Sequence, residues 1–306
     1  MASTSTTSTL PARRFTHNDL IILSVVLIWG LNFTIVKFAL RDLSPLAFNA
    51  LRFSAATTAL LIIMRLRGES FALRRQDLVP VILLGFGGHT LYQACFINGM
   101  ALTTPAVASL LMGTSPLFVA LFGALLGIER LRPTVVVGIV LSFVGITLLI
   151  IGGRGEVTWQ SGALLGDLLI LMAAMLWAGY TLGGKPLLGR YSPLKLNAFT
   201  MVPGTTLLVL ISVPQLANQD WGAVKPGAWA ALGYSATFAV VVAYVLWYTS
   251  VQRVGGARTA VYSNLTPVVA SLVSWLAMGE SLTPVQLVGA AIVITGIVLA
   301  RRGRTG

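Results

Sequence analysis

Long apolar stretches alternate with short polar segments along the whole chain, and this pattern sets its fold class. A helix needs roughly 20 apolar residues to cross the hydrocarbon core of a bilayer. Against that length the pattern predicts an all-α integral membrane protein with ten transmembrane helices. The expected spans are residues 20–40, 45–64, 78–99, 104–126, 134–151, 164–184, 193–213, 227–249, 257–278 and 285–300. The fifth and tenth are short enough to require tilt or local thinning of the bilayer.

The positive charges lie mainly between these spans, and their distribution predicts the orientation of the chain. With the N-terminus inside, 16 of the 21 Lys and Arg residues fall in cytoplasmic segments and three in outer loops. Cytoplasmic loops of membrane proteins carry such an excess. We therefore expect both termini in the cytoplasm, residues 1–18 as a cytosolic tail, and a bacterial cytoplasmic (inner) membrane as the location.

Composition argues against a soluble enzyme, a nucleic-acid-binding protein and a disordered protein. Hydrophobic residues make up 56% of the chain and charged residues 10%, with a mean hydropathy of +0.85. A soluble domain carries roughly 25% charged residues. The net charge of +12 is typical of nucleic-acid binding only where cations form a patch, and here they flank apolar spans, so we expect no nucleic-acid partner. The lone Cys95 excludes an intramolecular disulfide.

The two halves of the chain repeat each other. An offset of 148 gives 12 identities over 32 positions between residues 19–50 and 167–198. An offset of 151 gives 12 identities over 44 positions between residues 106–149 and 257–300. The identities include Trp29/Trp177, Lys37/Lys185, Asn49/Asn197, Pro116/Pro267, Glu129/Glu280 and Gly145/Gly296. The sequence thus predicts two five-helix repeats, over residues 19–152 and 162–302.

An odd number of spans in each half has a topological consequence. The second repeat must enter the membrane from the opposite side, which makes the pair an inverted repeat. That architecture is typical of secondary transporters, whose substrate site lies between the repeats near the membrane midplane. Duplication that only enlarged a helical bundle is the alternative, so a membrane scaffold or a channel stays open.

Several short motifs carry a resemblance to a known family. They are Trp29-Gly30-Leu31-Asn32-Phe33, Ser44-Pro45 with Leu51-Arg52-Phe53, and Ser115-Pro116-Leu117 with Glu129-Arg130-Leu131, echoed at Trp177, Ser192-Pro193 and Thr266-Pro267 with Glu280-Ser281-Leu282. Across nearly the whole chain, the sequence resembles the EamA repeats of the drug/metabolite transporter superfamily. Within it, the chain is most similar in character to YddG-type exporters of aromatic and other neutral amino acids. The resemblance implies export of small metabolites.

Polar and aromatic side chains near the middle of the spans are the candidates for substrate binding. His89, Tyr92, Gln93 and Phe96 share one helix face by their spacing, and a lone intramembrane histidine fits either hydrogen-bonded structure or a cavity lining. The expected substrate-binding residues are Trp29, Asn32, His89, Tyr92, Gln93, Trp177, Tyr180, Tyr244, Trp247, Tyr248 and Asn264.

Other residues have two interpretations each. Lys37 and Lys185 fit either snorkelling anchors or gate groups at the two entrances. Pro116 and Pro267, expected in the middle of their spans, fit either packing kinks or hinges. Arg52 is close enough to the outer surface to snorkel or to pair with Asp42 or Glu280; a structural pairing role is expected, with substrate contact as the alternative.

The candidate groups are aromatic, amide, hydroxyl and imidazole, and they favour a small zwitterion such as a neutral or aromatic amino acid. Its ammonium would rest on Trp or Tyr faces. Another small uncharged or amphipathic metabolite is the alternative. No mid-span carboxylate pair, nucleophile with a base, or metal-ligand set occurs, so we expect neither an enzyme nor a cofactor or metal. Coupling to protons through His89 and transport down the substrate gradient both stay open, as does the oligomeric state.

Overall fold

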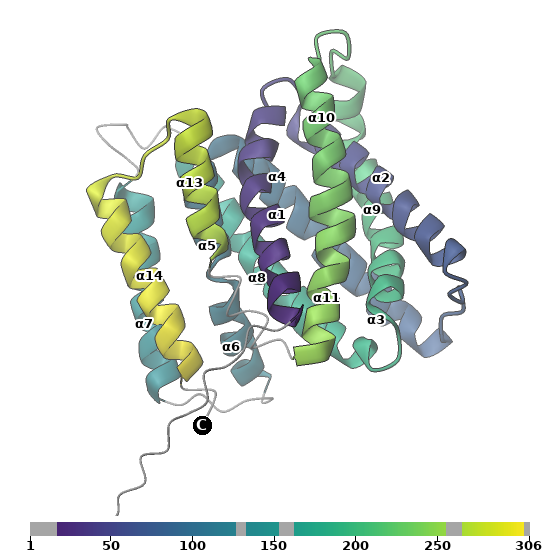
Figure 1. Ribbon diagram of the computed structural model, residues 1–306, viewed down its shortest axis with the longest axis horizontal. Coiled ribbons are helices and arrows are strands. Elements are labelled where there is room, and N and C mark those ends of the chain that lie inside the picture. Colours follow the sequence, from purple (N-terminus) through teal and green to yellow (C-terminus); the bar gives the residue numbers. More distant parts are fainter. Residues whose placement is uncertain (1–16, 127–132, 153–161, 255–264, 303–306) are drawn as a thin grey trace, which may run out of the picture.

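The computed structural model describes residues 17–126, 133–152, 162–254 and 265–302 (Figure 1). Within these ranges every regular element is a helix. The first half contains α1 (His17–Ala39), α2 (Pro45–Leu66), the 3₁₀-helix η1 (Arg75–Asp77), α3 (Leu78–Gly85), the π-helix η2 (Phe86–Leu91), α4 (Tyr92–Leu102), α5 (Pro105–Met112), α6 (Ser115–Leu125) and α7 (Pro133–Gly152). The second half contains α8 (Ala163–Leu188), α9 (Pro193–Asn218), α10 (Pro226–Tyr234), the π-helix η3 (Ser235–Val242), α11 (Ala243–Val254), α13 (Thr266–Met278) and α14 (Pro284–Arg302).

Local sequence explains where several of these helices begin. Proline opens α2 at Pro45 and α9 at Pro193, where its missing N–H would have had no helical partner. Ser192 caps α9, because its side-chain oxygen accepts a hydrogen bond from the backbone N–H of Lys195. The same Ser-Pro pair at Ser44 and Pro45 opens α2.

The helices confirm an all-helical integral membrane protein, with spans of unequal length. Seven helical segments are long and apolar enough to cross a membrane: Leu20–Ala39, Pro45–Leu66, Arg75–Leu102, Pro105–Leu125, Ala163–Leu188, Pro193–Asn218 and Pro226–Arg253. Three shorter apolar helices, Val136–Leu148, Thr266–Met278 and Pro284–Gly296, lie where the fifth, ninth and tenth spans were expected. Among the described residues, therefore, seven of the ten expected spans have full length.

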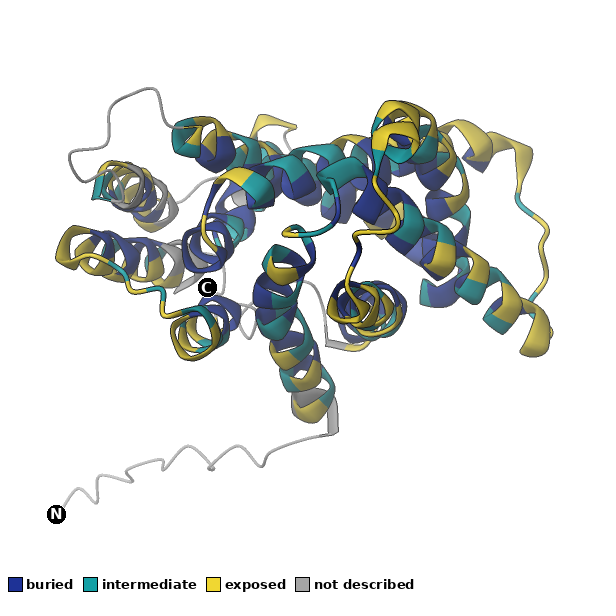
Figure 2. Ribbon diagram, turned by 90° about the horizontal axis from the view of Figure 1, so that it is seen from above, coloured by how far each residue is buried: buried dark blue, intermediate teal, exposed yellow. Residues whose placement is uncertain are grey.

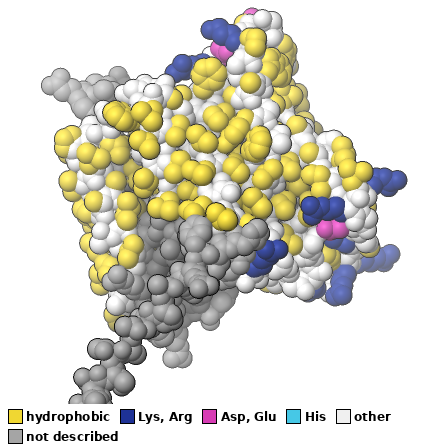
Figure 3. Space-filling view, in the orientation of Figure 1, with side chains coloured by type: hydrophobic (Ala, Val, Ile, Leu, Met, Phe, Trp, Pro, Cys, Tyr) yellow, Lys and Arg dark blue, Asp and Glu magenta, His cyan; other side chains and the backbone are white. Residues whose placement is uncertain are grey.

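The surface has the character that a lipid environment requires. Large apolar side chains such as Leu27, Leu83, Leu210 and Leu272 are more than half exposed. Figure 3 shows apolar side chains across the middle of one face, with most of the Lys, Arg, Asp and Glu side chains near its edges. Seen from above, buried positions face neighbouring helices and exposed positions face outward (Figure 2). Such a broad apolar surface would be unfavourable in water.

Helices α7 and α14 pack side by side at one edge of the molecule (Figures 1 and 2), and glycines set their separation. A Cβ atom added at Gly145 would lie 2.7 Å from the carbonyl oxygen of Gly289. One added at Gly296 would lie 2.5 Å from the carbonyl oxygen of Gly138. The two helix backbones are therefore in direct contact. The offset of 151 relates Gly138 to Gly289 and Gly145 to Gly296, so the two contacts are equivalent.

The prediction that Pro116 and Pro267 lie inside continuous helices is wrong. The fourth span is divided: α5 ends at Met112, and α6 begins at Ser115 with Pro116 in its first turn. Pro267 lies in the first turn of α13. A proline in a first turn removes no helical hydrogen bond and meets no carbonyl four residues earlier. The physical reason is that proline has no backbone N–H to donate and a fixed φ that suits the first turn of a helix.

Candidate functional site

Aromatic side chains from three helices meet in the interior of the bundle. Trp29 on α1 packs against Trp177 on α8 with ring centroids 5.8 Å apart, edge to face. On α11, Tyr244 lies 6.1 Å from Trp29 and 5.5 Å from Trp177. Trp247 lies 5.3 Å from Trp29 and 6.3 Å from Trp177. These separations fall within the range of favourable aromatic pairing.

Four further rings extend this group. Tyr92 lies 5.4 Å from Trp177, and Tyr180 lies 5.6 Å from Trp177. Tyr180 in turn contacts His89 at 5.0 Å and Tyr248 at 5.7 Å. The sequence-predicted residues Trp29, His89, Tyr92, Trp177, Tyr180, Tyr244, Trp247 and Tyr248 thus form one connected group, which we call the aromatic cluster.

Residues related by the sequence offsets contact each other here. The offset of 148 joins Trp29 to Trp177, whose rings pack together. The offset of 151 joins Gln93 to Tyr244, and Gln93 Nε2 donates a hydrogen bond to the Tyr244 hydroxyl at 3.3 Å. A residue touches its own equivalent where both lie near a two-fold axis. The aromatic cluster therefore lies where the two halves of the chain meet.

Two asparagines repeat one hydrogen bond in the two halves. Asn49 Nδ2 donates to the carbonyl oxygen of Gln93 at 2.9 Å. Asn197 Nδ2 donates to the carbonyl oxygen of Tyr244 at 3.4 Å. The offset of 148 relates the donors and 151 relates the acceptors. Sequence reasoning missed both asparagines as site residues, although their identity in the repeat was visible.

The third long span of each half contains a wide helical turn beside the cluster. The π-helix η2 precedes Tyr92 and Gln93, and η3 precedes Tyr244 and Trp247. π-Helical turns are rare and occur frequently at functional sites. Where α3 passes into η2, its backbone touches that of α9, because a Cβ atom at Gly204 would lie 2.4 Å from the carbonyl oxygen of Gly85.

His89 lies on η2 and is fully buried. Its Nε2 lies 3.0 Å from Thr200 Oγ1 on α9, and its Nδ1 has no hydrogen-bond partner in the structure. Thr200 also lies 3.3 Å from the Tyr180 hydroxyl. His89 is thus in the aromatic cluster, with one nitrogen held by a neutral hydroxyl.

Arg52 is a buried cation next to the aromatic cluster, and its expected ion pair is wrong. Its side chain is 2% exposed, and its partners are Gln93 Oε1 at 2.6 Å from Nη2 and Ser235 Oγ at 3.0 Å from Nη1. Neither Asp42 nor Glu280 contacts it. Its position in α2 places it against α4 and η3, whereas Asp42 lies before α2 and Glu280 follows α13.

Asn32 joins the same polar group. Ser235 Oγ donates to Asn32 Oδ1 at 2.7 Å, and both side chains are buried. The chain of contacts therefore runs from Asn32 through Ser235 to Arg52, and from there through Gln93 to Tyr244. Sequence reasoning missed Ser235, since nothing in the repeat distinguishes it.

The two candidate gate lysines have different surroundings. Lys37 Nζ donates to the carbonyl oxygens of Met100, Ala101 and Thr103, at 3.0, 3.0 and 2.7 Å, and so holds the C-terminal end of α4. Lys185 is exposed on α8. Both gate roles stay predictions. The predicted binding residue Asn264 lies outside the described residues.

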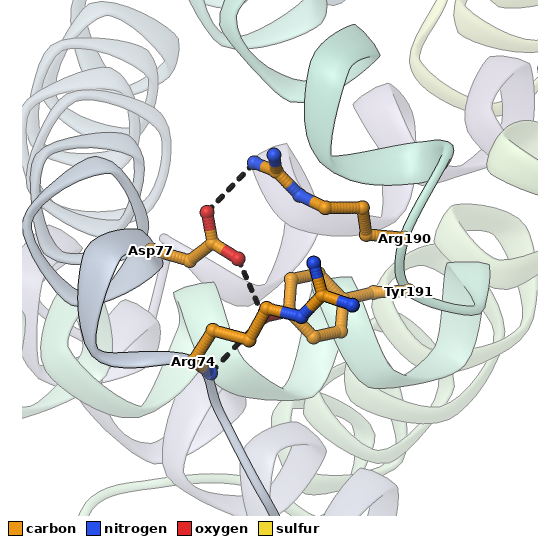
Figure 4. A network of polar contacts seen from close by, with 4 residues as sticks. All are labelled: Arg74, Asp77, Arg190 and Tyr191. Carbon is orange, nitrogen blue, oxygen red and sulfur yellow. Dashed lines mark hydrogen bonds and ion pairs between the residues drawn. The ribbon is translucent and has the colours of Figure 1, made fainter.

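At one end of α2 and α9, polar side chains connect the two halves (Figure 4). Arg190 pairs with Asp77 at 2.7 Å between Nη2 and Oδ1. The Tyr191 hydroxyl donates to Asp77 Oδ2 at 2.6 Å and accepts from the backbone N–H of Arg74 at 3.2 Å. Burial, followed by the hydrogen bond to the Asp77 carboxylate, raises the pKa of Tyr191. We call these four residues the Arg74 network.

The opposite end of α2 and α9 carries equivalent contacts of different chemistry. Gln219 Oε1 accepts from the Ser44 hydroxyl at 2.7 Å, as Glu69 Oε2 accepts from Ser192 at 2.6 Å at the other end. The backbone N–H of Lys225 donates to Asp42 Oδ2 at 3.3 Å. We call Asp42, Ser44, Gln219 and Lys225 the Gln219 network. Among the described residues, no group of three or more His, Cys, Asp or Glu side chains is placed to hold a metal ion.

Comparison with known proteins identifies the family of this chain. Residues 18–151 and 164–302 each match the EamA-like transporter family. The chain belongs to this family. As a member, it is a membrane transporter with a small-molecule substrate.

Curated relatives cover nearly the whole EamA chain at low identity. An uncharacterized transporter of Bacillus subtilis, YyaM, is 29% identical over 92% of both chains. A "probable amino-acid metabolite efflux pump" of Escherichia coli is 29% identical over 92% of this chain and 93% of its own. A "probable terminal-alkyne amino-acid exporter" of Streptantibioticus cattleyicolor is 27% identical, over 94% and 93%.

A solved crystal structure supports the same fold. It superposes with a TM-score of 0.67 at 21% identity, over 92% of this chain and 96% of the other. At that identity the likeness concerns the fold alone.

Proposed function

We propose that this EamA protein exports neutral and aromatic amino acids from the cytoplasm by alternating access. The observation that carries the proposal is the aromatic cluster, which combines ring faces with buried amide, hydroxyl and imidazole groups where the two halves meet. Export of another small uncharged or amphipathic metabolite is the alternative. The names of the two amino-acid exporting relatives support the first choice.

The proposal requires ten spans arranged as two inverted five-helix repeats, over residues 19–152 and 162–302. Contacts between equivalent residues support it: Trp29 with Trp177 and Gln93 with Tyr244 in the cluster, and the glycines of α7 and α14 at the edge. Inverted repeats allow inward-open and outward-open states of similar energy, because exchanging the conformations of the halves converts one state into the other.

We propose that substrate binds among Trp29, Asn32, His89, Tyr92, Gln93, Trp177, Tyr180, Tyr244, Trp247, Tyr248 and Asn264. In the structure the rings of the cluster contact one another, so a substrate enters when α1, α8 and α11 separate. Pro116 and Pro267 are the proposed hinges, since each lies at the start of a helix. Lys37 and Lys185 are the proposed gates.

The proposed orientation places both termini in the cytoplasm of a bacterial inner membrane. The excess of cations in the predicted cytoplasmic segments supports it. The Arg74 network then faces the cytoplasm and the Gln219 network the outside, because they lie at opposite ends of α2 and α9.

Counterflow in proteoliposomes tests the function. Purified protein reconstituted with internal unlabelled phenylalanine should accelerate the entry of external labelled phenylalanine, leucine or tryptophan over protein-free liposomes. Equal rates across the amino-acid panel would reject the amino-acid substrate. A cysteine placed at position 17 and one at 303, in a Cys95→Ala background, should both be labelled from the cytoplasmic side; labelling from opposite sides would reject the even number of spans.

A further inference from the structure

Arg52 is an uncompensated positive charge inside a membrane-spanning segment. It is the eighth residue of α2, about 10 Å along the helix axis from its start. Its side chain is 2% exposed. Among the described residues, no carboxylate lies within ion-pair distance, and the partners Gln93 and Ser235 are neutral. A buried charge without a counter-ion is costly, and intramembrane charges are retained where they have a function.

The guanidinium is held with donor capacity to spare. An Arg side chain has five N–H donors in a planar fork. The hydrogen bonds to Gln93 and Ser235 engage the two terminal nitrogens, and Nε has no partner in the structure. Phe48 and Phe53 lie against the guanidinium at 5.4 and 5.0 Å from their ring centroids. These contacts fix the plane of the fork, and a fixed fork matches the two oxygens of a carboxylate.

The position of Arg52 relates the charge to the aromatic cluster. Gln93 bonds both Arg52 and the Tyr244 hydroxyl, so a single residue separates the cation from the rings. An anionic group at Arg52 would therefore leave the rest of a small ligand beside Trp29 and Trp177, which pack against Tyr244.

Among the described residues, no free buried carboxylate lies beside the cluster to pair with an ammonium group of a substrate. The buried carboxylates there belong to Asp77 and Asp167. Asp77 is engaged in the Arg74 network, and Asp167 accepts a hydrogen bond from Thr103 near the start of α8. An ammonium beside the cluster would find ring faces and neutral oxygens such as Asn49 Oδ1, and these attract a cation more weakly than a carboxylate does.

The positive charge of Arg52 is not repeated at the equivalent position of the second half. The residue equivalent to Arg52 in the second half is Thr200, which contacts His89 and Tyr180. At these two equivalent positions, a ligand with two separated anionic groups would therefore meet one cation.

From this arrangement we infer that Arg52 binds the carboxylate of the substrate, and that the substrates are monocarboxylates with an aromatic or apolar body, for which an ammonium group is dispensable. The inference rests on the proposed function and narrows it. An aromatic amino acid and its deaminated acid both belong to this class. The corresponding amine and amide do not belong to it, since neither has a negative charge to pair with the Arg52 guanidinium.

Competition in counterflow tests the inference. Labelled phenylalanine is the probe, and unlabelled phenylalanine, 3-phenylpropionate, phenethylamine and phenylalaninamide are the competitors. For the wild-type protein we expect phenylalanine and 3-phenylpropionate to inhibit at similar concentrations, and the amine and amide to require about 10- to 100-fold more, as loss of a charge-assisted hydrogen bond predicts.

Substitutions assign the effect to one residue. Arg52→Gln should weaken competition by phenylalanine and 3-phenylpropionate by about 10- to 100-fold, and Arg52→Lys, which keeps the charge without the fork, by less. Arg65→Gln, the same change at an exposed position of α2, should leave competition unchanged. If Arg52→Gln does not fold, the wild-type panel still decides, because equal inhibition by phenethylamine and phenylalanine would overturn the inference.

The outcomes separate the inference from the proposed function. Phenylalanine counterflow that phenethylamine inhibits equally, or that a folded Arg52→Gln variant retains in full, would overturn the inference and leave amino-acid transport standing. Counterflow of labelled 3-phenylpropionate that depends on Arg52, without any flux of amino acids, would reject the amino-acid substrate and support the carboxylate site.

Discussion

The side-chain oxygens of Thr57 and Thr205 lie 2.8 Å apart, although 148 positions separate the two residues. Thr57 is on α2 and Thr205 on α9, and both are buried. The offset that relates Trp29 to Trp177 relates this pair as well. Two equivalent hydroxyls can bond each other only where both approach the axis between the halves, so this hydrogen bond fixes α2 against α9 near that axis.

This bond predicts coupling between two substitutions. Thr57→Val and Thr205→Val should each lower the thermal midpoint in detergent, because each leaves the other hydroxyl buried without its partner. The double variant should lose less than the sum of the two, with a coupling of about 0.6 kcal/mol, the average for side-chain hydrogen bonds between membrane helices. Strictly additive losses would show that the contact carries no energy.

The aromatic cluster predicts which tryptophans transport requires. Trp29→Ala and Trp177→Ala should each reduce counterflow about two- to tenfold while the protein keeps its helical circular dichroism, because an aromatic contact contributes about 0.5–1.5 kcal/mol beyond its buried area. Trp221→Ala is the matched control, since Trp221 is 39% exposed and stacks on Trp229 away from the cluster. Normal flux in both cluster variants would place these rings in the structural core instead.

The Arg74 network predicts a pH-dependent contribution to stability. Tyr191→Phe removes a hydrogen bond to a carboxylate and should lower the free energy of unfolding by about 1.5–3 kcal/mol. The pKa of Tyr191 is raised above its ordinary value of 10.0. The wild-type contribution is therefore complete below about pH 10 and is lost as the pH rises through the folded-state pKa.

Thermal melts of wild type and Tyr191→Phe between pH 6 and pH 9 should accordingly differ by a constant amount. A difference that disappears between pH 6 and pH 8 would contradict the assignment, because Tyr191 stays protonated across that range.

The glycines between α7 and α14 predict a steric effect. Gly145→Leu should separate the two helices and lower thermal stability, because even a Cβ atom at this position would lie 2.7 Å from a backbone oxygen. Gly179→Ala on α8 is the control, since nothing lies within 4 Å of a Cβ there, and its gain in helix propensity should raise stability by up to about 1 kcal/mol. Equal melting temperatures for the Gly145→Leu variant and wild type would show that the helices are not closely packed.

Much of the site was predictable because the repeat placed polar aromatic residues at equivalent depths. Trp29, Trp177 and Tyr180 were expected near the middle of their spans, and they do meet one another and Tyr244. The environment of Arg52 was not predictable, because it depends on which faces of α4 and η3 turn toward α2. Spacing along one helix determines the face of a residue and not the helix opposite it.

The helix break between α5 and α6 and the π-helices were missed for different reasons. Residues 104–126 read as one span because the segment is apolar over most of its length, although α5 and α6 are separate helices and Gly113 with Ser115-Pro116 is a helix stop and start signal. The π-helices η2 and η3 leave no clear sequence signal, because a wide turn changes the register of the following residues without changing their hydrophobicity.

The backbone contact between α7 and α14 has a mechanical consequence. Side chains that interdigitate can slide past each other by changing rotamers, but backbones in contact at glycine have nothing to rearrange. We therefore expect α7 and α14 to move as one rigid pair throughout the transport cycle. The helices that carry the aromatic cluster and Arg52 would then tilt relative to this pair.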